Sequence, residues 1–224
     1  MQYKEYPAYK DSGVDWLGDI PKGWNIRRLK FFSESVSTGT TPPSSNSEYY
    51  EFPNTLWYTP ADFVNGSIVL DESKRMINSI AIKEGVVKKF REGSILVVGI
   101  GATLGKVALA QREFTCNQQI NVIAPDKSMS PRFLAYSLCV KNEIMKMISN
   151  ASTLGIMNQE KTKQVHLCAP LIEEQNKIAD FIEYKTKQID QLIEKKKALI
   201  EKLNEQRIAV ITRAVPKGWT KPSP

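Results

Sequence analysis

Residues 171–215 read LIEEQNKIADFIEYKTKQIDQLIEKKKALIEKLNEQRIAVITRAV and contain neither glycine nor proline. Most of this stretch is Lys, Glu, Leu, Ile and Gln, which are good or fair helix formers. Pro170 suits the entrance of a helix, and Glu173 and Glu174 suit its positively polarised first turn. The stretch therefore predicts one helix from Leu171 to about Arg213, roughly 64 Å long at about 1.5 Å per residue.

Apolar residues along this helix alternate at spacings of four and three, which is the pattern of a coiled coil. Lys185, Lys196 and Gln206 interrupt the apolar stripe and are expected to help fix the orientation or register of a partner helix. We expect two copies of the chain to form a homodimer through antiparallel helices. The predicted interface residues are Ile178, Ile182, Ile189, Leu192, Leu199, Leu203 and Val210. The alternative is a helix that packs on its own globular domain.

Residues 1–170 have the pattern of a mixed α/β (α+β) domain. ILVV at 95–98 lies between glycines and indicates a buried strand, with further strands at 106–110 and 120–124. A helix pattern opens at Ser130-Pro131 and carries apolar residues as far as Ile148. The composition of residues 38–47 predicts a loop. The predicted architecture is a domain over 1–170 followed by a long helix over 171–214.

A short motif occurs twice. IPKGW at 20–24 returns as VPKGW at 215–219, with four of the five residues identical. Residues 215–224 are therefore predicted to be a tail that resembles the start of a second repeat.

The composition limits the chemistry. The chain has 224 residues, 31 Lys and Arg against 24 Asp and Glu, and a net charge of +7, which favours a polyanionic partner. Its one histidine, His166, cannot build a two-histidine metal site. Its three cysteines share no CxxC spacing, which argues against a disulfide framework and for a reducing compartment.

The N-terminal segment MQYKEYPAYK lacks the apolar core of a signal peptide. The most apolar run, residues 95–102, is far shorter than the roughly 18 residues that span a bilayer. We expect no membrane insertion and a cytoplasmic location.

The positive charge is concentrated in one part of the domain. Residues 74–112 carry eight basic side chains and are opposed there by Glu84 and Glu92, which leaves a net charge of +6. The alternative is an ordinary solvated surface that happens to be basic.

The catalytic motifs that the sequence suggests fail on inspection. GIGATLGK at 99–106 has the wrong glycine spacing for a phosphate-binding loop, and Val107 follows its lysine where Ser or Thr is required. Asp62, Glu72 and Lys74 could hold a metal ion in a nuclease, but this pattern is too loose to be specific. The chain is predicted to hold no metal and to be no enzyme.

Several segments together resemble the specificity subunits of Type I restriction–modification systems. KDSGVDWLGDIPKGW at 10–24 resembles the opening segment of that family, and EGSIL at 92–96 followed by GATLGK at 101–106 resembles its central strand-turn-strand. PLIEEQNKIA at 170–179 resembles the start of its conserved helix. Usual members carry two recognition domains and two such helices, so this chain resembles a half-subunit.

The resemblance implies a target-recognition domain that reads double-stranded DNA, with the helix acting as a ruler. It also implies modification and restriction subunits as partners. By the same resemblance, S-adenosylmethionine and ATP bind those partners, and this chain binds no cofactor.

Individual residues suit DNA binding. Basic side chains neutralise phosphates, amides can pair with adenine edges, and hydroxyl groups in a loop contact backbone or bases. The predicted DNA-binding residues are Lys74, Arg75, Lys88, Lys89, Arg91, Lys106, Asn117, Gln118, Gln119, Thr40, Thr41, Ser44 and Ser45. The alternative function is a coiled-coil adaptor whose basic patch binds an acidic protein.

Overall fold

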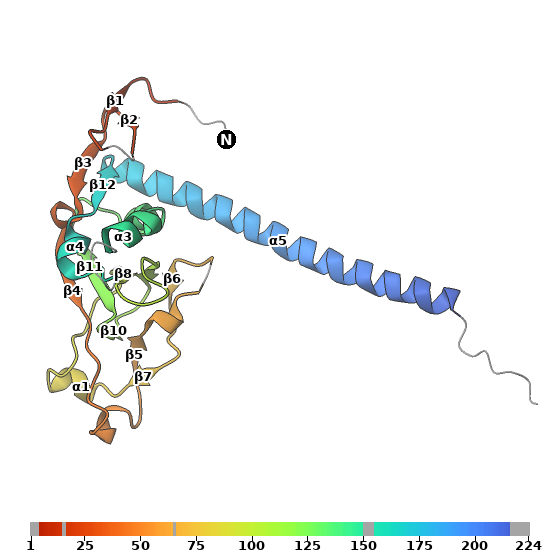
Figure 1. Cartoon of the computed structure of the whole chain (residues 1–224), viewed down its shortest axis with the longest axis horizontal. Helices are drawn as coiled ribbons and strands as arrows, with labels where there is room; N and C mark the ends of the chain where they lie inside the picture. The colour runs from red at the N-terminus through yellow and green to blue at the C-terminus, as the bar shows by residue number, and fades with distance from the viewer. Residues whose placement is uncertain (1–4, 15–16, 65, 150–154, 216–224) are drawn as a thin grey trace, which may run out of the picture. The chain divides into compact units, whose positions relative to one another are not determined.

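The structure is a computed structural model that describes residues 5–14, 17–64, 66–149 and 155–215. The chain divides into two compact units, residues 1–179 and 180–224 (Figure 1). Most of the second VPKGW motif lies outside the described residues.

The first unit is built around a five-stranded sheet in the order β4-β11-β8-β9-β6. Its strands are β4 (Ser33–Thr38), β6 (Val69–Leu70), β8 (Ile95–Val98), β9 (Val107–Ala110) and β11 (Ile120–Pro125). The predicted buried strand at 95–98 is confirmed as β8, which lies at the centre and is buried along its whole length. The predicted strands at 106–110 and 120–124 correspond to β9 and β11.

Alternation along β8 divides the core into two faces, because successive side chains of a strand point to opposite sides. Ile95 and Val97 pack on one face, where the helices cover the sheet. Leu96 and Val98 pack on the other face against aromatic side chains. That aromatic group comprises Tyr58, Phe63, Phe90 and Phe114.

Smaller sheets extend the unit. One has three strands in the order β10 (Thr115–Cys116), β5 (Thr55–Tyr58) and β7 (Met76–Ile77). The other two sheets have two strands each. One pairs β1 (Tyr9–Asp11) with β2 (Asp19–Pro21), and the other pairs β12 (His166–Ala169) with β3 (Asn25–Arg28). The 3₁₀ turns are η1 (Leu29–Phe31), η2 (Ser47–Tyr49) and η3 (Pro60–Asp62).

The helix pattern that opens at Ser130 forms two helices. α2 (Pro131–Cys139) and α3 (Asn142–Ser149) are separated by a turn at Val140 and Lys141. Lys141 follows Leu138 by three residues and precedes Met145 by four, so it falls on the apolar face, and its side chain is buried. Burial lowers the pKa of Lys141. Because α2 and α3 are separate helices, the prediction of one continuous helix after Ser130 is wrong. The remaining short helices are α1 (Ile80–Lys83) and α4 (Gln159–Lys163).

The predicted long helix is α5 (Ile172–Ala214). Its first turn is fixed within the first unit by Gln175, whose side chain is buried. Gln175 Oε1 accepts from the backbone N–H of Ser130 at 2.8 Å, and Nε2 donates to the carbonyl oxygens of Ser128 and Pro170, each at 2.9 Å. The amide therefore uses both its acceptor and its donors to join α5 to the entrance of α2.

The neighbouring Glu174 receives the N-terminal segment. Its Oε1 accepts from the Tyr6 hydroxyl at 2.5 Å and from Trp24 Nε1 at 3.3 Å. Trp24 also packs edge-on against Tyr6 and Phe133. The IPKGW and PLIEEQ motifs are thus in direct contact.

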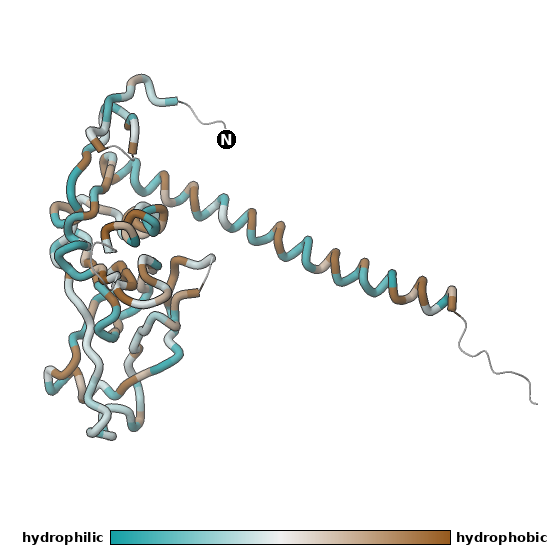
Figure 2. Tube along the Cα trace, in the orientation of Figure 1, coloured by the Kyte–Doolittle hydropathy of each residue, from teal (hydrophilic) through white to brown (hydrophobic). Residues whose placement is uncertain are grey.

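The part of α5 that lies beyond the first unit alternates apolar and polar residues along its length (Figure 2). None of the described helices is both long and apolar enough to cross a membrane.

Candidate nucleic-acid interface

A pocket of about 640 Å³ lies beside β5 and brings together three of the segments predicted to bind DNA. We call it the β5 hollow. It is lined by Thr41, Trp57, Thr59, Pro60, Ala61, Lys74, Arg75, Asn117 and Gln119. Residues that are far apart in the sequence therefore share one site.

The loop after β4 reaches this hollow because Gly39 lacks a side chain. A Cβ on Gly39 would lie 2.1 Å from the carbonyl oxygen of Cys116. This close approach allows the backbone N–H of Thr40 to donate to that oxygen at 2.8 Å. The Thr40 carbonyl in turn accepts from Trp57 Nε1 at 3.4 Å, and the Thr41 hydroxyl donates to Gln118 Oε1 at 2.5 Å. Only glycine fits at position 39.

Asp62 organises the opposite wall. Its carboxylate is buried, and one oxygen accepts from the backbone N–H and hydroxyl of Thr59 at 2.7 and 2.9 Å. The other oxygen accepts from the backbone N–H of Lys74 at 2.7 Å. Asp62 is therefore a structural group, and the described residues contain no cluster of three or more metal-ligating side chains.

Two cations lie at the rim of the hollow. Lys74 and Arg75 are exposed, and the Arg75 guanidinium lies over the Trp57 ring at 5.7 Å from its centroid. Lys74 Nζ donates to the carbonyl oxygen of Ala61 at 2.6 Å. Since none of the residues lining the hollow is acidic, these charges meet no carboxylate there.

The three amide residues at 117–119 differ in how far their side chains are available to contact a ligand. Asn117 is buried, its Oδ1 accepts from the backbone N–H of Gln119 at 3.1 Å, and its Nδ2 donates to Gln119 Oε1 at 2.9 Å. Gln118 is exposed and Gln119 is half-buried. Asn117 is therefore a supporting residue for Gln119 rather than a contact of its own.

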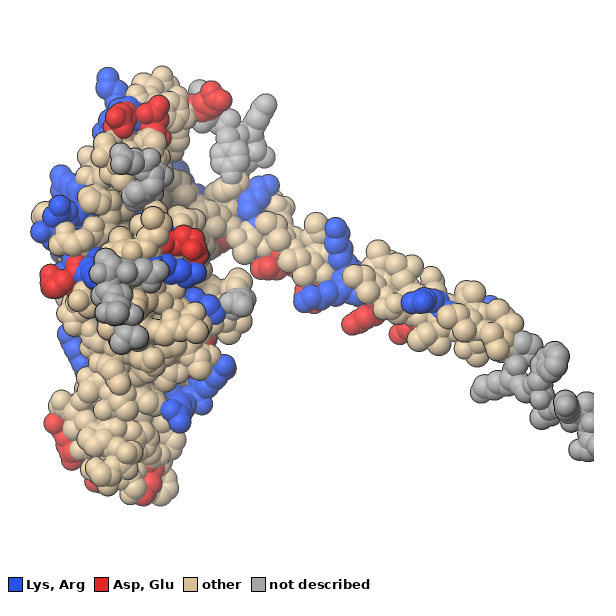
Figure 3. Space-filling view, in the orientation of Figure 1, with Lys and Arg blue, Asp and Glu red and all other residues tan. Residues whose placement is uncertain are grey.

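Three of the six other basic residues of the cluster pair with acidic side chains, which corrects the picture of an uncompensated patch. The three acidic partners all lie outside residues 74–112 in the sequence. Lys89 pairs with Glu113 at 2.6 Å, Arg91 with Glu34 at 3.0 Å, and Arg112 with Asp71 at 2.8 Å. On the face shown in Figure 3, basic and acidic side chains are interspersed.

The remaining predicted contacts lie outside the β5 hollow. Lys88 donates to the Ser37 hydroxyl at 2.9 Å, and Lys106 donates to the carbonyl oxygen of Phe63 at 3.2 Å. Ser44 and Ser45 lie in an exposed turn.

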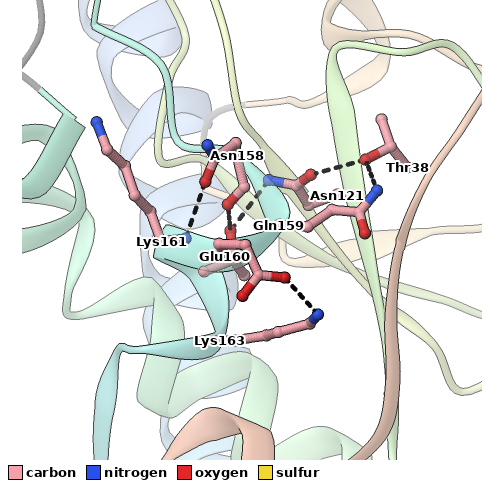
Figure 4. Close-up of polar contacts among 8 residues, drawn as sticks. Thr38, Asn121, Asn158, Gln159, Glu160, Lys161 and Lys163 are labelled. Atoms are coloured by element: carbon pink, nitrogen blue, oxygen red, sulfur yellow. Dashed lines mark hydrogen bonds and ion pairs between the residues drawn. The ribbon is translucent and has the colours of Figure 1, made fainter.

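A second hollow of about 380 Å³ adjoins the first through Gln119. Asn121 and Gln159, which the sequence analysis did not single out, line it together with Thr38 (Figure 4). Gln159 Nε2 donates to the Thr38 hydroxyl at 2.7 Å, and that hydroxyl donates to Asn121 Oδ1 at 3.2 Å. The signal for Asn121 was its position as a polar residue in the otherwise apolar strand INVIA.

The GIGATLGK segment forms the other side of this second hollow. The backbone N–H of Gly99 donates to the Gln119 carbonyl at 2.7 Å, and a Cβ on Gly99 would lie 2.6 Å from the Met157 carbonyl oxygen. The segment joins β8 to β9, so it is a turn between strands. Gly99 allows close backbone packing, and Gly101 and Gly105 adopt positive φ angles of 100° and 84°, which favour glycine.

The predicted interface residues of the helix fall into two groups. Ile178 packs against the core of the first unit, and Ile182 is only partly exposed. The others have more than half of their surface exposed. These exposed residues are Ile189, Leu192, Leu199, Leu203 and Val210.

Comparison with known proteins gives the family. The model of the Type I restriction modification DNA specificity domain matches residues 21–202. The chain belongs to this family. It is 31% identical over 229 residues to the Type I restriction enzyme MjaIX specificity subunit of Methanocaldococcus jannaschii, an alignment that covers 91% of the chain and 51% of that protein. It is also 29% identical over 119 residues to the HindI specificity subunit of Haemophilus influenzae, covering 53% of the chain and 25% of that protein.

Solved structures show the same fold. A chain from a structure of a type I R-M system aligns with a TM-score of 0.70 and 21% identity, covering 92% of this chain and 48% of that one. The HsdS subunit from Thermoanaerobacter tengcongensis aligns with a TM-score of 0.59 and 21% identity, covering 82% of this chain and 41% of that one. The predicted mixed α/β domain with a long helix is confirmed. The chain spans about half the length or less of the curated relatives it matches.

Proposed function

We propose that this chain is a DNA-recognition component of a Type I restriction–modification complex. The first unit reads double-stranded DNA through the β5 hollow, and partner subunits carry out adenine methylation and restriction. The observation that carries the proposal is the set of Thr41, Lys74, Arg75 and Gln119 around one acid-free hollow, in a chain of the specificity family. Family membership favours this function over the adaptor hypothesis.

The salt dependence of binding tests the position of the DNA surface. Each phosphate that a cation neutralises contributes about −0.9 to the slope of log K against log salt. Replacing Lys74 and Arg75 together by Gln should therefore flatten the slope by about 1.8. Lys89→Gln is the matched control, because Lys89 already pairs with Glu113. A double variant with the wild-type slope would place the DNA elsewhere.

The cofactors belong to the partner subunits in this proposal. We expect S-adenosylmethionine to bind the modification subunit and ATP to serve the restriction subunit, with neither bound by this chain. Equilibrium dialysis of the purified chain against each labelled compound tests this division. Saturable binding of either compound would contradict it.

The exposed stripe of α5 supports a homodimer as the functional form. Side chains such as Leu192, Leu199 and Leu203 are each more than half exposed, and a stripe of this length is typical of a helix that pairs with another. An antiparallel pair would relate two recognition units by a two-fold axis. The target would then consist of two inverted half-sites separated by a spacer.

Sedimentation tests the homodimer. Leu199→Asp would bury a charge against the partner helix, at a cost of several kcal/mol, and should yield monomers. Ala198→Asp places the same charge one residue away and off the stripe, so it should leave the dimer intact. A monomeric wild-type chain, or a dimeric Leu199→Asp variant, would contradict this mode of pairing.

A further inference from the structure

Gln119 occupies a distinctive position because it lines both hollows. Its main chain is held from two sides. The carbonyl oxygen accepts from Gly99 at 2.7 Å, and the backbone N–H donates to Asn117 Oδ1 at 3.1 Å. The base of the side chain is therefore fixed relative to the central sheet.

The orientation of its amide follows from these contacts. A backbone N–H can only donate, so the atom of Asn117 that it meets must be the oxygen. The Asn117 nitrogen then faces Gln119, and the atom it meets at 2.9 Å must be the acceptor, Oε1. Gln119 Nε2 is left on the side away from Asn117, near the turn at Gly101, with no acceptor among the described residues.

The free Nε2 points to one kind of base edge. Glutamine pairs with adenine by using its oxygen and nitrogen together. Here Asn117 occupies one of the two lone pairs of the oxygen and holds it toward the protein, so the groups that the side chain offers most directly to a ligand are its Nε2 donors. Adenine and cytosine each present an amino donor in the major groove, and thymine presents a single acceptor, O4, beside its methyl group. Guanine presents two neighbouring acceptors, N7 and O6, and no donor, so it is the edge that can use both hydrogens of Nε2.

We propose that Gln119 reads a guanine edge through its Nε2 donors and that Asn117 sets this choice by holding the amide in place. The inference rests on the proposed DNA-recognition function and names the base class that the site takes. Lys74 and Arg75 at the rim are charged and exposed, which suits phosphate. Gln119 is neutral and half-buried, which suits a directional contact to a base.

Asn117→Asp tests the proposal without changing the residue that faces DNA. Both oxygens of the new carboxylate are acceptors, so the Gln119 amide should turn to donate Nε2 to Asp and present Oε1 outward. The preferred base should then change from guanine to one that offers an amino donor, cytosine or adenine. A good pairing is worth about 1–3 kcal/mol, so the guanine preference at that position should fall by about 5-fold to 150-fold.

The assay is selection of bound sequences from a random duplex pool by the full chain at low salt. Gln119→Glu is the second variant, because it presents an acceptor directly and leaves Asn117 unchanged. Gln111→Glu, at an exposed position of the same unit, is the control for added negative charge and should keep the guanine preference. Urea unfolding of each variant confirms that it is folded.

The outcomes distinguish a failure of the inference from a failure of the proposed DNA-recognition function. A guanine at one position in wild type that is lost in both Asn117→Asp and Gln119→Glu supports the inference. Unchanged base preferences in both variants, or a uniform loss of affinity at every position as expected for a phosphate contact, overturn it. Failure of the wild-type chain to retain any duplex would instead overturn the proposed function.

Discussion

Replacing Gln175 by Ala should strongly destabilise the first unit. The substitution removes the acceptor of the Ser130 N–H and the donor to the Pro170 carbonyl, both of which belong to buried residues. The third partner, the carbonyl of Ser128, belongs to an exposed residue where water can replace the amide. Two buried polar groups are therefore left without partners.

The magnitude follows from these two groups. A buried donor or acceptor that loses its partner costs about 1–3 kcal/mol. At about 2 kcal/mol each, Gln175→Ala should lower the free energy of unfolding by about 4 kcal/mol. Gln191→Ala is the control, because Gln191 is exposed on the same helix and off the apolar stripe, and such substitutions change stability by about 0.5 kcal/mol or less.

Urea unfolding followed by tryptophan fluorescence measures the difference, since Trp24 and Trp57 lie in the first unit. The two variants should differ in their free energy of unfolding, while the slope of that free energy against urea concentration stays the same. A Gln175→Ala variant whose free energy of unfolding lies within about 1 kcal/mol of that of Gln191→Ala would refute the role given to the Gln175 amide.

Gln175→Glu extends the test to pH. The carboxylate would replace Nε2 by an oxygen that faces two carbonyl groups in a buried position, so its pKa in the folded state should rise above the ordinary value of about 4.3. The folded state then holds the proton to higher pH than the unfolded state does, and stability falls as the pH rises from about 4.3 through the folded pKa. If Gln175→Glu lowers the free energy of unfolding equally at acidic and at alkaline pH, this reasoning is wrong.

Three further predictions concern other contacts. Gly39→Ala should displace the loop that approaches Cys116, at a cost of about 1–3 kcal/mol in the free energy of unfolding. The displaced loop should weaken DNA binding by about tenfold or more. A fluorescence titration that gives the wild-type affinity for DNA would contradict this prediction. Burial raises the pKa of the Cys116 thiol, so alkylation mapped by mass spectrometry should modify the exposed Cys139 and reach Cys116 only in urea. Desolvation and the hydrogen bond to Glu174 raise the pKa of Tyr6 to about 12, so the contact should be complete below pH 10 and lost between pH 10 and about 12. Tyr6→Phe should remove that step from an ultraviolet absorbance titration.

The features that the sequence predicted well depend on local patterns. ILVV at 95–98 forms the central strand because its side chains are apolar on both faces, and the glycine-free stretch after Pro170 forms one helix. The helix after Ser130 was predicted without its break, because apolar residues continue on both sides of the turn at Val140 and Lys141, and the burial of Lys141 is known only from the structure.

The candidate site was harder to predict because it depends on contacts between distant segments. Arg91 pairs with Glu34, and this pairing across 57 positions is absent from any local charge count. Asn117 and Gln119 were identified as amides suited to adenine. Their hydrogen bond, which engages Gln119 Oε1 and leaves Nε2 on the side away from Asn117, depends on backbone geometry that a residue pattern does not contain.

The central sheet separates two cores, and this has a consequence for evolution. The aromatic core under the β5 hollow packs on one face, while Met129, Ala169 and Ile178, which surround the start of α5, belong to the other. The sheet therefore separates the side chains of the aromatic face from those that hold the start of α5. If the chain reads DNA as proposed, a change of target that is confined to the aromatic face would leave this attachment intact, so that diversification and compatibility would be inherited on opposite sides of one sheet.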